Sequence, residues 1–158
     1  MRVTNTRSGF DGGATGDFCM TFVYRWLTVL HITFLLFLTY LADSGKGMRL
    51  WLAVERIPYG DKIGHLLLMG LLAFLVNMSL RCERIKLLSV LKGSAIVWVL
   101  VTLEEWSQLL FSRRSFSLQD LAADYIGIIL FGQLALWVFN RSERKNSPIG
   151  MSTTSSAE

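Results

Sequence analysis

The chain has 158 residues, of which 52% are hydrophobic and 18% are charged, and its mean hydropathy is +0.43. Soluble domains usually carry about 25% charged residues. The apolar residues of this chain also form long continuous runs instead of amphipathic periods, so the sequence predicts a membrane protein. The net charge of +4 forms no basic face of a soluble domain, which argues against nucleic acid as a partner.

Four apolar segments are each close to the ~20 residues that a helix needs to cross a bilayer. They cover residues 22–42, 63–80, 87–111 and 118–139. We therefore expect an all-α, polytopic membrane fold with four transmembrane helices. A cleaved signal peptide is the rival interpretation of the first segment. Its apolar region is longer than the ~7–15 residues typical of signal peptides, which favours a retained helix.

The segments that flank this membrane domain are polar. Residues 1–20 show no periodicity, and residues 141–158 are rich in Ser, Thr and charged side chains. Both segments are predicted to be disordered, which leaves residues 21–140 as one four-helix membrane domain. Met20 lies two residues before the first apolar segment and is a second candidate translation start.

The distribution of basic residues predicts the orientation. Ten of the 16 Lys and Arg residues lie in the N-terminal segment, the second loop and the C-terminal tail, and six lie in the first and third loops. Because cytoplasmic loops carry the excess of Lys and Arg, both termini are expected in the cytoplasm. Cys19 and Cys82 would then face a reducing compartment, so no disulfide is expected.

Polar residues gather at the boundaries of three predicted helices. With four spans, the start of the second, the end of the third and the start of the fourth lie on one side of the membrane, which the charge count places outside. The residues expected to converge there as a ligand-binding site are Asp61, Lys62, His65, Glu105, Gln108, Arg114, Asp120 and Asp124. Ionisable side chains inside a membrane segment are costly and are often functional.

Some of these residues also have purely structural interpretations. Asp61 and Asp120 lie in first turns of predicted helices, where carboxylates cap free N–H groups, and Ser117 to Asp120 resembles a capping box. Lys62 and Arg114 could contact headgroup phosphates. Both interpretations stay open on the sequence alone.

His65, Glu105 and Asp124 are harder to explain structurally, and they are the candidate catalytic residues. Asp124 lies about 6 Å deeper than Asp120 at ~1.5 Å per helical residue. A carboxylate at that depth needs a partner or a proton. Around it, Ala123, Gly127 and Gly132 form a stripe of small residues that predicts close helix packing.

Three motifs occur in a fixed order: Asp61-Lys-x-x-His65, then Glu105-x-x-Gln108, then Arg114 followed by Asp120, Asp124 and Gly127. In this order they resemble the VanZ-like family of small bacterial membrane proteins, across residues 58–133. The family usually has Asn where this chain has Asp124, which adds a negative charge here. The resemblance implies a multi-pass protein of the bacterial cytoplasmic (inner) membrane, with a role in the cell envelope such as glycopeptide (teicoplanin-type) resistance.

Two functions follow as hypotheses. In the first, the site binds an anionic amphiphile, a lipid-linked cell-wall precursor or a glycopeptide, with Lys62 and Arg114 on its phosphate or carboxylate. In the second, the protein is a membrane-interface enzyme that uses His65, Glu105 and Asp124 as acid and base on a lipid-linked substrate.

No cofactor is expected. His65 and the carboxylates could hold a divalent metal ion, but no HExxH or Cys-rich motif is present and the neighbouring Lys and Arg residues would repel a cation, so no metal is expected either. A transporter is disfavoured because the sequence contains no sign of an inverted repeat.

Overall fold

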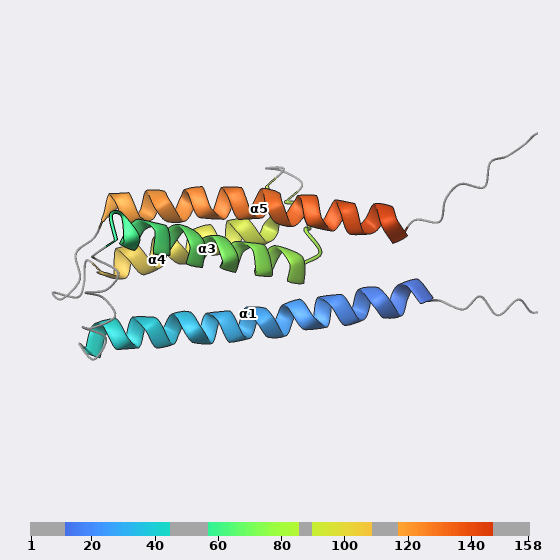
Figure 1. Cartoon of the computed structure of the whole chain (residues 1–158), viewed down its shortest axis with the longest axis horizontal. Helices are drawn as coiled ribbons and strands as arrows, with labels where there is room; N and C mark the ends of the chain where they lie inside the picture. The colour runs from blue at the N-terminus through green and yellow to red at the C-terminus, as the bar shows by residue number, and fades with distance from the viewer. Residues whose placement is uncertain (1–11, 45–56, 86–89, 109–116, 147–158) are drawn as a thin grey trace, which may run out of the picture.

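The computed structural model describes residues 12–44, 57–85, 90–108 and 117–146. Four helices run through these residues: α1 (Gly12–Ser44), α3 (Gly60–Ser79), α4 (Lys92–Gln108) and α5 (Leu118–Asn146). Their long axes are roughly parallel and alternate in direction, so the starts of α3 and α5 lie at the same end of the bundle as the end of α4 (Figure 1). The predicted all-α class is confirmed for the described residues, which contain an isolated bridge but no strand.

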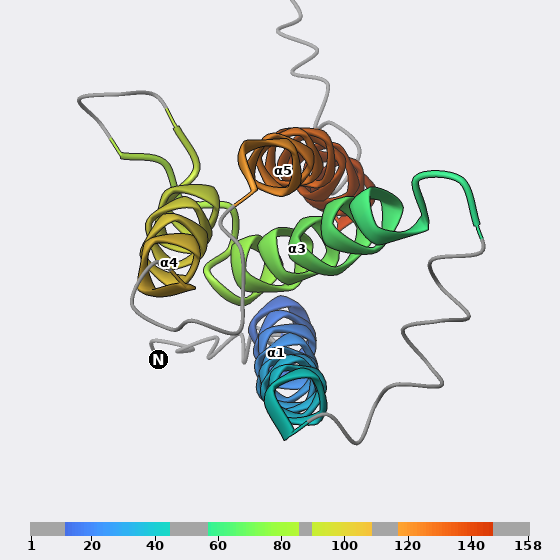
Figure 2. The same cartoon turned by 90° about the vertical axis from the view of Figure 1, so that its left-hand side faces the viewer.

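Helix α3 is the centre of the bundle. It contacts α1, α4 and α5, and the view along the bundle places α1 on one side of α3 and α5 on the other (Figure 2). The main core lies between α3, α4 and α5 and is built from Leu72, Ala73, Val97, Val101 and Ile128. Helix α1 is peripheral, because only 6% of its most apolar window is buried.

Three helices are long and apolar enough to cross a membrane, within Met20–Leu41, Gly60–Ser79 and Leu118–Lys145. This finding indicates a multi-pass membrane protein. Helix α4 has 17 residues and is therefore about 25 Å long at ~1.5 Å per residue, which is shorter than the ~30 Å hydrocarbon core of a bilayer. The described part of α4 thus falls just below the length of a full membrane span.

The first and last helices extend beyond their predicted limits. Helix α1 begins at Gly12, so residues 12–20 are helical where disorder was expected. Helix α5 continues to Asn146, seven residues past the expected end at residue 139. Once a helix is nucleated, each further residue adds one hydrogen bond at little cost. In α5, Arg144 and Lys145 in the last turn also suit the negative end of the helix dipole. Residues 1–11 and 147–158, which were also predicted to be disordered, lie outside the described residues.

Helix α4 begins later than predicted, at Lys92 instead of residue 87. The described residues before it pair with the chain after α3: the Lys92 N–H donates to the Glu83 carbonyl at 2.8 Å, and Arg84 forms an antiparallel bridge with Leu91. These backbone bonds replace helical ones, so the apolar residues Val90 and Leu91 belong to the loop.

The predicted stripe of small residues is confirmed at the α3–α5 contact. An added Cβ at Gly127 would collide with the backbone carbonyl of Leu66, so the backbones of the two helices lie against each other. At Gly132 an added Cβ would meet the hydroxyl of Ser94 in α4 at 2.6 Å, so this end of the stripe faces α4. The close approach at Gly127 brings the first turns of α3 and α5 together.

Asn77 joins α3 to the start of α4. Its side chain is fully buried, its Nδ2 donates to the Ser94 Oγ at 2.8 Å, and its Oδ1 accepts from the Ser94 N–H at 3.1 Å. The amide therefore satisfies one of the free N–H groups in the first turn of α4. Gly93 leaves room for it, because an added Cβ there would overlap the Asn77 side chain.

We predict that Asn77→Ala destabilises the bundle by about 1–3 kcal/mol, because the Ser94 N–H and hydroxyl lose their partners in a buried site. Thermal unfolding of the protein in detergent micelles measures the change as a lower midpoint. Asn140→Ala, at an exposed position of α5, is the matched control and should leave the midpoint within error. Equal midpoints for the two variants would contradict the role assigned to Asn77.

Candidate functional site

Six of the predicted site residues meet at the end of the bundle where α3 and α5 begin. We refer to them as the polar cluster: Asp61, Lys62 and His65 from α3, Glu105 from α4, and Asp120 and Asp124 from α5. They come together because three helix ends share this end of the bundle (Figure 1). Glu105 and Asp124 are each only 1% exposed, so the cluster reaches from the surface into the packed interior.

The partly exposed His65 pairs with the buried Asp124. The His65 Nδ1 lies 3.2 and 3.3 Å from the two carboxylate oxygens of Asp124. Its Nε2 is 4.0 Å from an Asp61 oxygen, on the more exposed side of the ring. Asp124 therefore fixes the orientation of the imidazole and leaves Nε2 directed toward the surface. A histidine held in this way by a carboxylate is a common acid–base arrangement.

Glu105 caps α5 from a different helix. Its Oε1 accepts a hydrogen bond from the Ser117 N–H at 2.8 Å, while the Ser117 Oγ accepts from the Asp120 N–H at 3.3 Å. The capping box predicted for residues 117–120 is therefore half formed. In the reciprocal bond of such a box the Ser117 N–H would donate to the Asp120 carboxylate, but here it donates to Glu105 instead.

Because Glu105 accepts the hydrogen bond from the Ser117 N–H, the Asp120 carboxylate does not cap the helix and faces Lys62 instead. The Lys62 Nζ lies 3.5 Å from the Asp120 Oδ1. Within the described part of the chain that oxygen is buried and has no hydrogen-bond partner. Asp61 is more than half exposed, and α3 has no side-chain hydrogen bond at its N-cap. The capping interpretation of Asp61 is thus limited to its favourable place in the helix dipole.

The cluster contains a geometry that could suit a metal ion. Asp61, His65 and Asp120 each offer one ligand atom, and these atoms lie within 4.8 Å of one another. Mixed carboxylate and imidazole donors suit several divalent metals. However, Lys62 lies beside one of the Asp120 oxygens, and an ammonium group there competes with a cation for that ligand.

An apolar groove leads away from the cluster between α1, α3 and α4. It has a volume of about 420 Å³, within the ~300–1,000 Å³ usual for ligand sites. His65 and Glu104 contribute polar groups to its lining, while Leu36 of α1, Leu68 of α3 and Leu100 of α4 belong to its apolar walls. We call it the α1–α4 groove. It joins the polar cluster to a surface that suits a hydrocarbon chain.

The structure places most, but not all, of the predicted site. Gln108 is the last residue of α4, and its side chain, like the whole of Arg114, lies outside the described residues. The predicted partnership of Arg114 with the acidic groups therefore stays a prediction. Glu104 was not among the predicted ligand residues, although its charge within an apolar segment was the signal that could have identified it.

No protein-family model, curated protein sequence or solved structure matches the chain. A function for the chain is therefore inferred from the residues and geometry of the site.

We predict that Glu105→Ala and Glu105→Gln behave differently in thermal unfolding. The alanine variant leaves the Ser117 N–H without an acceptor and should lose about 1–3 kcal/mol of stability. The glutamine variant keeps a side-chain oxygen at that place and should unfold close to the wild type. If both variants lost the same stability, the negative charge of Glu105, and not its hydrogen bond, would be what matters.

Proposed function

We propose that the chain is a VanZ-like protein of the bacterial cytoplasmic membrane that binds an amphiphile, with the head group at the polar cluster and a hydrocarbon tail in the α1–α4 groove. The observation that carries this proposal is the continuity between the two: His65 belongs to both the cluster and the groove lining. A ligand with one polar and one apolar end would contact both at once. Glycopeptide resistance or envelope homeostasis is the cellular role that fits such a ligand.

The charges of the cluster narrow the choice of head group. Carboxylates outnumber cations among its described residues, since Lys62 and His65 face four acidic side chains. A simple anionic lipid would meet repulsion at Asp61 and Asp120. A lipid-linked cell-wall precursor suits the cluster better, because its phosphate can pair with Lys62 while its hydroxyl and amine groups donate to the carboxylates.

The apolar groove alone supplies little binding energy in a membrane. A hydrocarbon tail leaves one apolar solvent for another, so there is no hydrophobic gain of the kind found in water. Selectivity then comes from the head group. The charge-assisted hydrogen bonds that it makes are worth about 1.5–3 kcal/mol each, which makes Lys62 a determinant of affinity.

Leu100→Trp should block the α1–α4 groove and remove the bound amphiphile. The measurement is mass spectrometry of lipids that copurify with the protein. Leu103→Trp is the matched control, because Leu103 is equally exposed on α4 but does not line the groove. Lys62→Gln should lower the occupancy of phosphate-bearing lipids about tenfold or more. Equal lipid content in the two tryptophan variants would refute the proposal.

The same proposal includes four membrane crossings, with α4 as the third, and both termini in the cytoplasm. The alternating directions of the helices support this topology (Figure 1), as does the excess of Lys and Arg in the tail and the α3–α4 loop.

The orientation is tested with single cysteines in a cysteine-free background and a membrane-impermeant thiol reagent applied to intact cells. Cysteines at Ser44 and Tyr59 should be labelled, and cysteines at Glu83 and Arg144 should be protected until the cells are opened. All four positions are exposed, so burial within the protein does not explain protection. The reverse pattern would place the polar cluster on the cytoplasmic side.

The enzyme hypothesis is favoured by one observation, the pairing of His65 with the buried Asp124. This pair leaves Nε2 available to move a proton on a head group bound beside Asp61. A changed head group on the recovered amphiphile, produced by the wild type but not by His65→Gln, would decide for the enzyme. An unchanged ligand that binds both proteins would decide for the binding protein.

A further inference from the structure

A second groove lies between α4 and α5, and none of its lining residues belongs to the polar cluster. Its volume is about 380 Å³. Its walls are largely apolar and include Leu91, Ala95, Trp98, Ile128, Ile129 and Leu136. We call it the α4–α5 groove. It shares no lining residue with the α1–α4 groove, so it is a separate feature of the surface.

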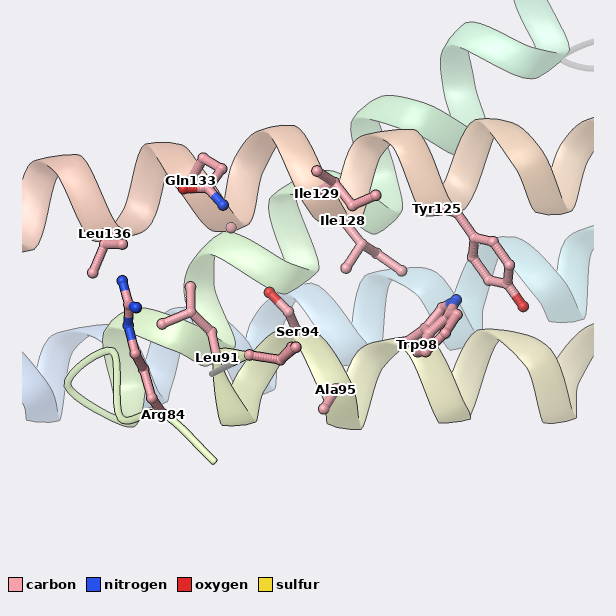
Figure 3. A pocket seen from close by; sticks show the side chains of 12 residues that line it. Arg84, Leu91, Ser94, Ala95, Trp98, Tyr125, Ile128, Ile129, Gln133 and Leu136 are labelled. Atoms are coloured by element: carbon pink, nitrogen blue, oxygen red, sulfur yellow. The ribbon is translucent and has the colours of Figure 1, made fainter. Parts of the chain in front are cut away.

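The two ends of the α4–α5 groove differ in chemistry. Figure 3 shows Arg84 reaching from the α3–α4 loop toward α5 beside Leu136, with Trp98 and Tyr125 at the opposite end. The rings of Trp98 and Tyr125 meet edge to face with centroids 5.3 Å apart. The Tyr125 hydroxyl is held by the Thr102 Oγ1 at 2.8 Å. The groove is thus charged at one end and closed by fixed aromatic rings at the other.

The length of the groove matches one leaflet of a bilayer. Along α5 it runs from Leu136 to Tyr125, about 16 Å at ~1.5 Å per residue. Half of the ~30 Å hydrocarbon core of a membrane is about 15 Å. A lipid tail that starts at the level of Arg84 would therefore end near Trp98.

Arg84 differs from the other basic side chains around this loop. Lys92 is paired with Glu83, and Arg81 lies 3.5 Å from Glu143. No carboxylate among the described residues forms an ion pair with Arg84, which is exposed. The hydrogen bond from Lys92 also lowers the pKa of the Glu83 carboxyl, so Glu83 stays charged and committed to Lys92. Arg84 is thus available to an anion from outside the chain.

We propose that the α4–α5 groove binds one acyl chain of an anionic phospholipid of the surrounding bilayer, with the lipid phosphate on Arg84. The tail gains nothing by exchanging lipid for an apolar groove, so the guanidinium selects the lipid by its charge. Arg suits this role because its planar fork of N–H groups matches phosphate oxygens. The Arg84 end of the site lies at the opposite end of the bundle from the polar cluster, and no lining residue of the groove belongs to that cluster. The site is therefore independent of the function proposed for the cluster.

Trp98 provides a direct probe of the site. A variant that keeps Trp98 as its only tryptophan is placed in nanodiscs of phosphatidylcholine. Increasing fractions of phosphatidylglycerol or phosphatidylcholine brominated near the chain end are then added. Bromine quenches tryptophan fluorescence on contact, so quenching reports the tail at the closed end of the groove. Phosphatidylglycerol should quench at a mole fraction at least about fivefold lower than phosphatidylcholine.

Matched variants distinguish a specific lipid site at Arg84 from a general attraction of anionic lipids to the basic surface. Arg84→Gln should abolish the preference for phosphatidylglycerol. Arg144→Gln, which removes the same charge at the same end of the bundle, should keep it. Ala95→Phe should fill the groove and lower quenching by both lipids, while Val99→Phe, one turn further on α4 and outside the groove, should not.

Two results would overturn the proposal: equal quenching by the two lipids in the parent variant, or an undiminished preference in Arg84→Gln. If the single-tryptophan variant does not fold by circular dichroism, the difference in quenching between the wild type and Trp98→Phe gives the same quantity. The arginine variants are then compared in both backgrounds.

Discussion

The carboxylate of Glu105 is the contact on which the arrangement of this bundle depends. Glu105 lies in the last turn of α4 and accepts a hydrogen bond from the N–H of Ser117, the residue before α5, twelve residues further along the chain. Because Glu105 takes that donor, Asp120 is not needed for the cap and faces Lys62 instead. Because the start of α5 is fixed in this position, Asp124 lies one turn deeper, where it meets His65. The buried carboxylates of Glu105 and Asp124 thus each have a hydrogen-bond partner, while the carboxylate of Asp120 lies beside the Lys62 ammonium group.

Sequence reasoning reaches the outline of this arrangement but not its pairings. Long apolar runs predict the helices, and their alternation along the chain predicts which ends meet, so the gathering of Asp61, His65, Glu105 and Asp124 follows from counting segments. Which of them pair depends on the rotation of α3 against α5. That rotation is set where Gly127 meets the backbone of Leu66, a contact that no local pattern encodes. Spacing alone pairs His65 with Asp61, four residues earlier, whereas the structure brings His65 closer to Asp124, 59 residues later.

The ends of the helices are also difficult to predict from the sequence, for a different reason. Hydropathy cannot tell an apolar loop residue from the first turn of a helix, so Val90 and Leu91 were assigned to a span that begins only at Lys92. The start of α4 is set by the backbone hydrogen bonds between residues 83–85 and 90–92 and by the Asn77 amide. Asn77 caps α4 although it lies 17 residues before Ser94 in the sequence. At the end of α5 the error is the opposite one: polar residues that predict disorder are helical as far as Asn146. Arg141 stacks on Trp137 one turn earlier, and the basic last turn suits the negative end of the helix dipole.

The peripheral place of α1 has a consequence for how the α1–α4 groove is filled. The hydrogen bonds between helix α1 and α3 include one between the His31 ring and the Leu68 carbonyl and one between the Thr28 and Ser79 hydroxyls. The lining residues Ile32, Leu36, Ile96 and Leu100 are each at least 40% exposed, so the groove opens sideways along its length. In a membrane such a groove exchanges its contents by lateral diffusion within one leaflet. The quantity that sets its occupancy is then the mole fraction of the amphiphile among lipids, a two-dimensional concentration that does not depend on how little of it dissolves in water.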